Sequence, residues 1–205
     1  MNLEKSRLKI NIILTQNSDE AQYELFQRLN TGGTTLSEQE VRNCLMLMLN
    51  TDFYSVINTL KDYPNFKNCI NLPTNNYDQE YHMELILRMF IGYANLVNYE
   101  KHGPISKIIL SEFINQETTN LISNANIEEF ENAFKKTFDK LYSVLGDNSF
   151  KKYDKYKHHF YGAFNVSVFE MITSGISANI NTIVNIGDDV LKQKIIDIYN
   201  LPRGY

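Results

Sequence analysis

The hydrophobic pattern of this chain is typical of a helical protein. From residue 18 onward, apolar side chains recur every three or four residues, the spacing that places them on one face of an α-helix. We therefore expect a bundle of about seven to nine helices. The segments expected to be helical are 18–30, 37–50, 52–63, 78–101, 106–115, 126–146, 152–174, 176–186 and 187–200.

Capping residues mark the expected helix starts. Ser37 with Glu40 three residues later forms a capping box, and Asp52 and Asn126 are suitable N-cap residues. The Asn- and Pro-rich segment 71–77 is expected to be a loop. The helix at 37–50 is apolar enough to be central, since it carries Val41, Cys44, Leu45, Leu47, Met48 and Leu49. In the helix at 106–115, the residues expected to face the core are Ile109, Leu110 and Phe113.

One segment has the two-residue period of a β-strand. Apolar side chains alternate with polar ones over residues 8–14, and no other segment gives a convincing strand. A lone strand leaves its backbone groups unpaired, so we expect it to pair with an upstream segment or a second chain. The expected fold is mainly α, a single domain over 1–205: a strand at 8–15, a helix–Gly-Gly loop–helix signature at 18–50 and a helical bundle at 51–205.

Composition narrows the classes of function. The 205 residues suffice for one domain with its own core, and 43% of them are hydrophobic. The net charge of −4 excludes a strongly basic nucleic-acid coat but allows a local basic patch. No apolar run approaches the ~20 residues that span a membrane, and no secretory signal is evident. We expect a cytoplasmic protein whose two cysteines are reduced thiols that form no metal motif.

The loop between the first two expected helices has the chemistry of an anion-facing turn. Gly32 and Gly33 lie among three threonines, and glycine allows both a tight turn and close approach of a ligand to the backbone. The N–H groups at the start of the next helix carry partial positive charge, and Arg28 and Arg42 flank the loop. These parts suit a phosphate group. An ordinary helix connection, in which Gly32 ends the first helix, explains the same composition.

A second candidate site lies at residues 150–161, where lysines alternate with aromatic residues. Such a mixture can contact a phosphate backbone and stack on bases, which makes Lys151, Lys152, Lys155 and Lys157 candidate nucleic-acid contacts. The alternative is a solvated helix start whose aromatic residues face the core. The adjacent histidines of this segment would point about 100° apart on a helix, so we expect no metal site.

Catalytic patterns are lacking. We identify no Ser-His-Asp, Cys-His or paired-carboxylate arrangement, and so assign no catalytic residue. Glu84 and Arg88 are four residues apart on an expected helix, which predicts an intrahelical ion pair. A functional Arg88 that faces the Gly32–Gly33 loop is the alternative.

Three segments together resemble a known family. Residues 26–43 read Phe-Gln-Arg-Leu-Asn-Thr-Gly-Gly-Thr-Thr-Leu-Ser-Glu-Gln-Glu-Val-Arg-Asn, residues 84–88 read Glu-Leu-Ile-Leu-Arg, and residues 164–170 read Phe-Asn-Val-Ser-Val-Phe-Glu. In order and spacing they are similar to the helical half of the N-terminal domain of GmrSD-type modification-dependent restriction enzymes, whose other half is related to ParB and sulfiredoxin. The resemblance extends over roughly residues 8–200.

The resemblance implies a role in antiphage defence. Members of the family bind and hydrolyse nucleotides and regulate the cleavage of DNA, often modified DNA. The resemblance also implies a nucleotide site that this chain shares with a ParB-like half. An NTP with Mg²⁺ would bind only when that half is present. By resemblance, the nucleotide-binding residues of this chain are Arg28, Asn30, Thr31, Gly32, Gly33 and Arg42.

The chain departs from the family pattern in two places. The family's Asp-Gly-Gln-Gln-Arg motif and its His-Asn-His nuclease domain are both absent. We therefore expect a helical subunit or fragment that contributes part of a nucleotide or DNA site without complete catalytic machinery. Its expected partners are a ParB-like protein or second chain pairing with residues 8–14, and DNA. Two alternatives remain: a non-enzymatic decoy or inhibitor of a full-length relative, and a DNA-binding helical domain.

Overall fold

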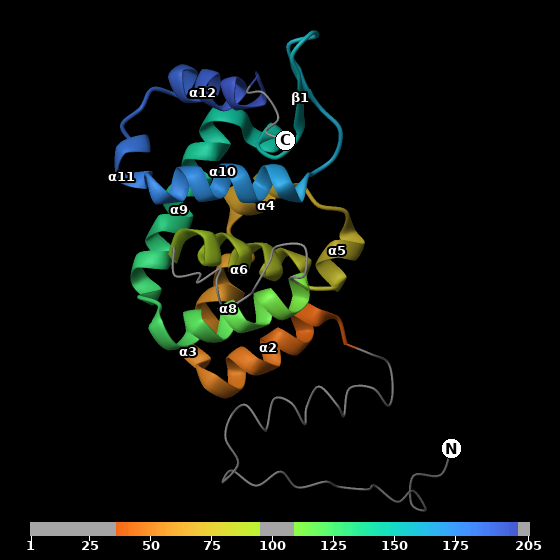
Figure 1. The fold of residues 1–205 in the computed structure, drawn as a ribbon, viewed down its shortest axis with the longest axis vertical. Coiled ribbons are helices and arrows are strands. Elements are labelled where there is room, and N and C mark those ends of the chain that lie inside the picture. The colour runs from red at the N-terminus through yellow and green to blue at the C-terminus, as the bar shows by residue number, and fades with distance from the viewer. Residues whose placement is uncertain (1–35, 95–108, 201–205) are drawn as a thin grey trace, which may run out of the picture. The chain divides into compact units, whose positions relative to one another are not determined.

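A computed structural model describes residues 36–94 and 109–200 of the chain (Figure 1). This part is mainly helical, as the sequence predicted, with ten α-helices and one two-stranded sheet. Its elements from Ser37 onward belong to one compact unit. The predicted strand at 8–14, the helix at 18–30 and the Gly32–Gly33 loop lie outside the described residues.

The helices follow one another with short connections. They are α2 (Glu38–Leu49), α3 (Thr51–Leu60), α4 (Pro64–Ile70), α5 (Thr74–Asp78), α6 (Tyr81–Ala94), α8 (Leu110–Asn124), α9 (Ile127–Leu145), α10 (Val166–Ala178), α11 (Ile180–Ile183) and α12 (Asp188–Asn200). Between α9 and α10 lie the short 3-10 helix η4 (Gly146–Asn148) and the antiparallel strands β1 (Lys152–Asp154) and β2 (His159–Tyr161).

The helices are arranged as a stack with one long helix across it. Figure 1 shows α10, α6, α8 and α2 lying one below another, and each contacts the next. Helix α9 contacts α3, α4, α10, α11 and α12, which makes it the central helix. Its buried Phe130, Phe134 and Phe138 recur every four residues as one aromatic stripe, which the buried Leu141 and Leu145 continue to the end of the helix. Phe138 contacts the rings of Phe66 on α4 and Phe169 on α10.

Two of the predicted caps are present and one is displaced. Ser37 and Glu40 form the expected capping box, and the Asn126 side chain caps α9. Helix α3, however, is capped by Asn50, whose Oδ1 accepts the N–H groups of the second and third helical residues. Pro64 starts α4, because proline fits the first helical turn, whereas α3 already ends at Leu60 and not at the predicted residue 63. The predicted loop at 71–77 contains the short helix α5.

Several predicted core positions are exposed. Helix α2 buries Leu45 and Met46, while Leu47 and Met48 face solvent. Ile109 and Leu110 are also exposed, and α8 buries Ile114, Glu117, Thr118 and Leu121 instead. Both helices are apolar on more than one side, so the pattern alone did not determine which side packs. That choice depends on the neighbouring helices.

The prediction of a helix over 152–174 is wrong in its first half, which forms the β1–β2 hairpin. Asp154 Oδ1 accepts the backbone N–H groups of Tyr156 and Lys157 at 2.9 and 3.0 Å, which closes a turn. His158 and Gly162 adopt positive φ values of 53° and 82°, which a helix cannot accommodate. The aromatic residues on either side favour strand pairing, and α10 begins only after the Asn165 cap.

Helices α6 and α10 approach closely at a glycine. A Cβ atom at Gly92 would lie 2.5 Å from the Oγ atom of Ser174, whereas one at Gly175 would meet nothing within 4 Å. Gly92 follows Arg88 by one turn and Ser174 follows Glu170 by one turn. The contact therefore lies on the same interface as the Arg88–Glu170 ion pair.

Alanine substitutions at Gly175 and Gly92 are expected to affect the free energy of unfolding differently. Gly175→Ala should raise the free energy of unfolding by about 1 kcal/mol, because alanine favours a helix and the site is open. Gly92→Ala should show no such increase, because the new Cβ atom clashes with the Ser174 hydroxyl. Adding Ser174→Ala to that variant removes the clash and should restore the increase in the free energy of unfolding. Urea denaturation of the single and double variants measures this. Equal stabilisation by both glycine substitutions would contradict the close packing.

His82 is a buried histidine near the start of α6. Its Nδ1 atom has no hydrogen-bond partner among the described residues, and its Nε2 atom lies 3.5 Å from the Glu80 carboxylate. Burial lowers the pKa of His82 below its ordinary value of 6.5, although the charge of Glu80 acts in the opposite direction. The folded protein therefore disfavours the protonated ring.

This lowered pKa predicts a loss of stability in mild acid. As the pH falls through 6.5, the unfolded chain takes up a proton at His82 that the folded chain resists, so the free energy of unfolding decreases. The decrease levels off below the lowered pKa of the folded state. The variant His82→Phe should show a shallower decrease between about pH 7 and pH 5 in urea titrations. Identical slopes for the two proteins would refute this assignment.

Candidate functional site

The described part of the chain contains a charge network that crosses the whole helix stack. It joins Arg42 of α2, Glu84 and Arg88 of α6, and Glu170 of α10. The Arg42 guanidinium donates a short hydrogen bond from Nη2 to Glu84 Oε2. Arg88 donates from Nε and Nη2 to Glu84 Oε1 at 2.9 and 2.8 Å, and from Nη1 to Glu170 Oε1 at 2.5 Å. The predicted Glu84–Arg88 ion pair is thus present, as one link of a longer chain.

Arg42 is the most deeply placed member of the network. Its side chain is 0% exposed, and a buried guanidinium is stable only when it is paired and hydrogen-bonded. Its Nε donates to Gln39 Oε1 at 2.9 Å, and its Nη1 donates to Asn115 Oδ1 of α8 at 3.1 Å. The contacts of Arg42 therefore extend from α2 to both α6 and α8.

The network is electrically balanced and reaches solvent at one end. Its two arginines face Glu84 and Glu170, Glu84 bridges both guanidinium groups, and the exposed Glu38 carboxylate lies 3.9 Å from Arg42 Nη1. Burial acts to lower the pKa of Arg88, but the hydrogen bonds and charges of Glu84 and Glu170 outweigh it, so the pKa is raised. The Glu170 side chain is 44% exposed, whereas Glu84 and Arg88 are nearly buried. This geometry holds helices in register.

Of the nucleotide-binding residues expected from the sequence, the structure describes only Arg42. Arg28, Asn30, Thr31, Gly32 and Gly33 lie outside the described residues. The buried position of Arg42 supports a positioning role, and its nucleotide contact stays a prediction. Sequence reasoning missed the links through Gln39, Asn115 and Glu170. A signal existed for Arg42, because a charged residue beside Val41 and one turn before Leu45 and Met46 falls on a buried helix face.

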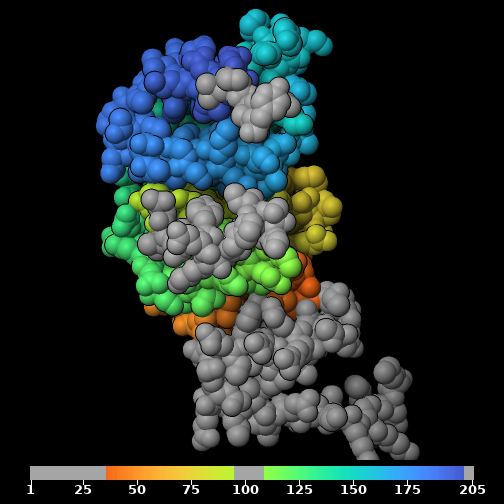
Figure 2. All heavy atoms as spheres, in the orientation of Figure 1, coloured from red at the N-terminus to blue at the C-terminus, as the bar shows by residue number. Residues whose placement is uncertain are grey.

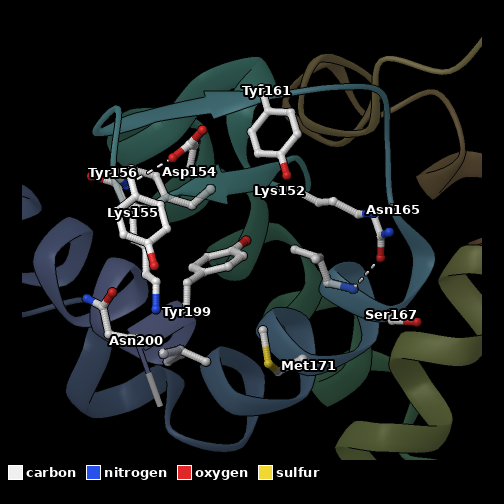
Figure 3. A pocket seen from close by; sticks show the side chains of 13 residues that line it. Lys152, Asp154, Lys155, Tyr156, Tyr161, Asn165, Ser167, Met171, Tyr199 and Asn200 are labelled. Carbon is white, nitrogen blue, oxygen red and sulfur yellow. Dashed lines mark hydrogen bonds between the residues drawn. The ribbon is translucent and has the colours of Figure 1, made fainter. Parts of the chain in front are cut away.

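The second candidate site is a groove beside the hairpin (Figure 3). The hairpin stands at the end of the unit near α12 (Figure 2), and a groove of about 820 Å³ lies between it and the ends of α10 and α12. This size falls within the range of about 300–1,000 Å³ that ligand pockets occupy. The groove is lined by Lys152, Tyr153, Asp154, Lys155, Tyr156, Tyr161, Asn165, Ser167, Val168, Met171, Ile198, Tyr199 and Asn200.

The four predicted nucleic-acid lysines divide into two groups. Lys152 and Lys155 line the groove, and neither has an ion-pair partner among the described residues. Lys151 and Lys157 do not line the groove. Lys151 instead donates a hydrogen bond to Asp147 Oδ2 at 2.8 Å. Sequence reasoning missed the contribution of Tyr199, because it is distant along the chain.

Other features of the described chain add no chemistry. Among residues 36–94 and 109–200, no three His, Cys, Asp or Glu side chains gather to hold a metal ion. No helix in these same ranges is both long and apolar enough to cross a membrane. Both cysteines are free thiols, and burial raises the pKa of Cys69 to about 12, which keeps it protonated and unreactive.

Comparison with known proteins was made by sequence and by structure. No protein-family model matches the chain, and no curated protein or solved structure matches it significantly. The resemblance to GmrSD-type enzymes therefore remains a prediction based on its three motifs.

The network predicts a large cost for removing its central charge. Glu84→Gln should lower the free energy of unfolding by about 3 kcal/mol, because two buried arginines lose their shared anion. The matched control is Glu131→Gln, which removes the acid of the half-exposed pair Glu131–Lys135 at the same four-residue spacing. That change should cost about 0.5 kcal/mol or less. Chemical denaturation of both variants measures the difference, and similar losses would argue against a network held by Glu84.

Proposed function

We propose that this chain is a helical subunit or fragment of a nucleotide-dependent antiphage protein of the GmrSD type. In this role it supplies part of a nucleotide or DNA site and lacks complete catalytic machinery of its own. The Gly32–Gly33 loop is the part of the site that it contributes. A ParB-like partner contributes the nucleotide chemistry, with Mg²⁺ bound only in the joint site.

One observation carries the proposal. The three segments that resemble the family are separated by tens of residues in the sequence, yet a charged residue from each joins the same network. Arg42 comes from the first segment, Glu84 and Arg88 from the second, and Glu170 from the third. Their convergence supports treating them as one functional unit.

In this proposal the network also gives the Gly32–Gly33 loop, which has no catalytic residue, a fixed helix on which to build a binding site. Ser37, the N-cap of α2, follows Gly33 by four residues, and the first turns of the helix are held by Gln39 and Arg42. Because Arg42 is anchored to α6 and α8, the start of α2 has a defined position in the helix stack. The N–H group of Glu40 is already capped by Ser37 Oγ, so in this proposal the anion meets the Gly32–Gly33 loop and the held helix start fixes where that loop joins the bundle.

The proposal is tested by measuring NTP hydrolysis by the chain alone and mixed with any ParB-like protein encoded beside it. The chain alone should show no turnover, and the mixture should hydrolyse NTP. Asn30→Ala should abolish the stimulated turnover, because the resemblance assigns Asn30 to the nucleotide pocket. The matched control is Asn181→Ala, an exposed asparagine near α11, which should leave turnover unchanged.

Two results would refute the proposal. Robust turnover by the isolated chain, abolished by Asn30→Ala, would show that the catalytic machinery is complete. Turnover in the mixture that is indifferent to Asn30→Ala would show that the loop contributes nothing to the site.

A further inference from the structure

The hairpin groove is a binding site in its own right, separate from the charge network. No network residue lines it. Its walls come from three segments: the hairpin, the first two turns of α10 and the last turn of α12. The inference drawn from it therefore stands independently of the proposed function.

The walls expose flat apolar surface that a folded protein normally buries. Tyr156 on the hairpin turn is 84% exposed and Tyr161 on β2 is 47% exposed. Met171 of α10 and Ile198 of α12 are also exposed and line the same groove. Four large apolar side chains gathered at one hollow mark a surface suited to an apolar or aromatic ligand.

The floor of the groove is held rigidly by packed aromatic rings. The ring of Tyr153 lies 4.9 Å from that of Phe160 and 6.0 Å from that of Tyr199. The Tyr199 hydroxyl donates a hydrogen bond to the Lys151 carbonyl at 2.9 Å, which ties α12 to the hairpin. Burial raises the pKa of Tyr199 to about 12, so this hydroxyl stays a donor at neutral pH. A ligand would therefore meet a preformed surface.

The groove is also locally cationic within an acidic chain. The charged residues that line it are Lys152, Lys155 and Asp154, a formal charge of +1, whereas the whole chain carries −4. The aspartate, Asp154, directs its carboxylate to backbone N–H groups of the turn. The Lys155 ammonium lies 5.3 Å from the centre of the Tyr156 ring, which places a cation beside the most exposed aromatic face. Lys152 lies on the other side of the groove in Figure 3.

We propose that this groove binds a single-stranded nucleic acid, with unstacked bases on Tyr156 and Tyr161 and phosphates at Lys152 and Lys155. Aromatic faces beside lysines are the combination by which proteins hold single strands without sequence preference. A duplex keeps its base faces stacked inside the helix, so it cannot use the tyrosines. The apolar walls distinguish this site from a purely electrostatic patch, which would bind duplex and single strand alike.

The experiment measures fluorescence anisotropy of a labelled oligothymidylate of about twelve nucleotides with the full chain, at about 50 and 200 mM salt. Tyr156→Ala should weaken binding by about tenfold, because one stacking surface is lost, and Tyr156→Phe should retain the affinity. The double variant Lys152→Ala/Lys155→Ala should weaken binding and reduce the salt slope by about 1.4, since each phosphate contact contributes about 0.7 for single strands.

Matched controls come from the same molecule. Lys157→Ala removes a lysine of the same hairpin that does not line the groove, and Tyr142→Ala removes an exposed tyrosine of α9. Both should leave the affinity unchanged. Tyr156 and the two lysines lie at the surface, so circular dichroism should show that their variants fold like the parent chain.

Competition with unlabelled ligands shows which form of nucleic acid the groove binds. A duplex of the same length should compete poorly, an oligouridylate should compete well, and a mononucleotide should compete only at much higher concentration. The proposal is overturned by absence of binding, by equal effects of Lys157→Ala and the double lysine variant, or by competition from duplex equal to that of the single strand. A mononucleotide that competes as well as the oligonucleotide would overturn the strand-binding assignment in favour of a nucleotide pocket.

Discussion

The buried guanidinium of Arg42 is the constraint on which the described helices depend. A charge removed from water must find its partners inside the protein, and Arg42 finds them on its own helix, on α6 and on α8. Glu84 then shares its carboxylate with Arg88, which reaches Glu170 on α10. Apolar contacts tolerate small shifts between helices, whereas this chain of hydrogen bonds does not. The network therefore links the four stacked helices through one continuous set of hydrogen bonds.

The aromatic core serves a different purpose. Phe130, Phe134 and Phe138 of α9 are buried and pack against aromatic rings of α4 and α6, and their burial supplies stability. The close approach at Gly92 depends on both, because the packing draws α6 and α10 together and the Arg88–Glu170 pair aligns them. The hairpin lies beyond this core, so its outward side chains remain available to a ligand.

Local features of the fold could be predicted from the sequence more fully than features that depend on long-range packing. The capping box at Ser37, the cap at Asn126 and the amphipathic stripe of α9 were predictable, because each depends on residues within one or two turns. The hairpin was missed because tyrosines and lysines at mixed spacing fit either a helix or a strand, and the Asp154 turn decided between them. The exposure of Leu47 and Ile109 was missed because apolar residues on several sides of a helix do not reveal which side packs.

By itself, the sequence determined the helical class and the approximate bounds of α2, α9 and α12, because these follow from local periodicity and capping. The pairing of Glu84 with Arg88 was also local, since one helical turn separates them. Only the tertiary structure brought Arg42, Asn115 and Glu170 to that pair, and Tyr199 to the lysines of the hairpin. Contacts between residues far apart in the chain depend on how whole helices pack, and no local pattern encodes that packing.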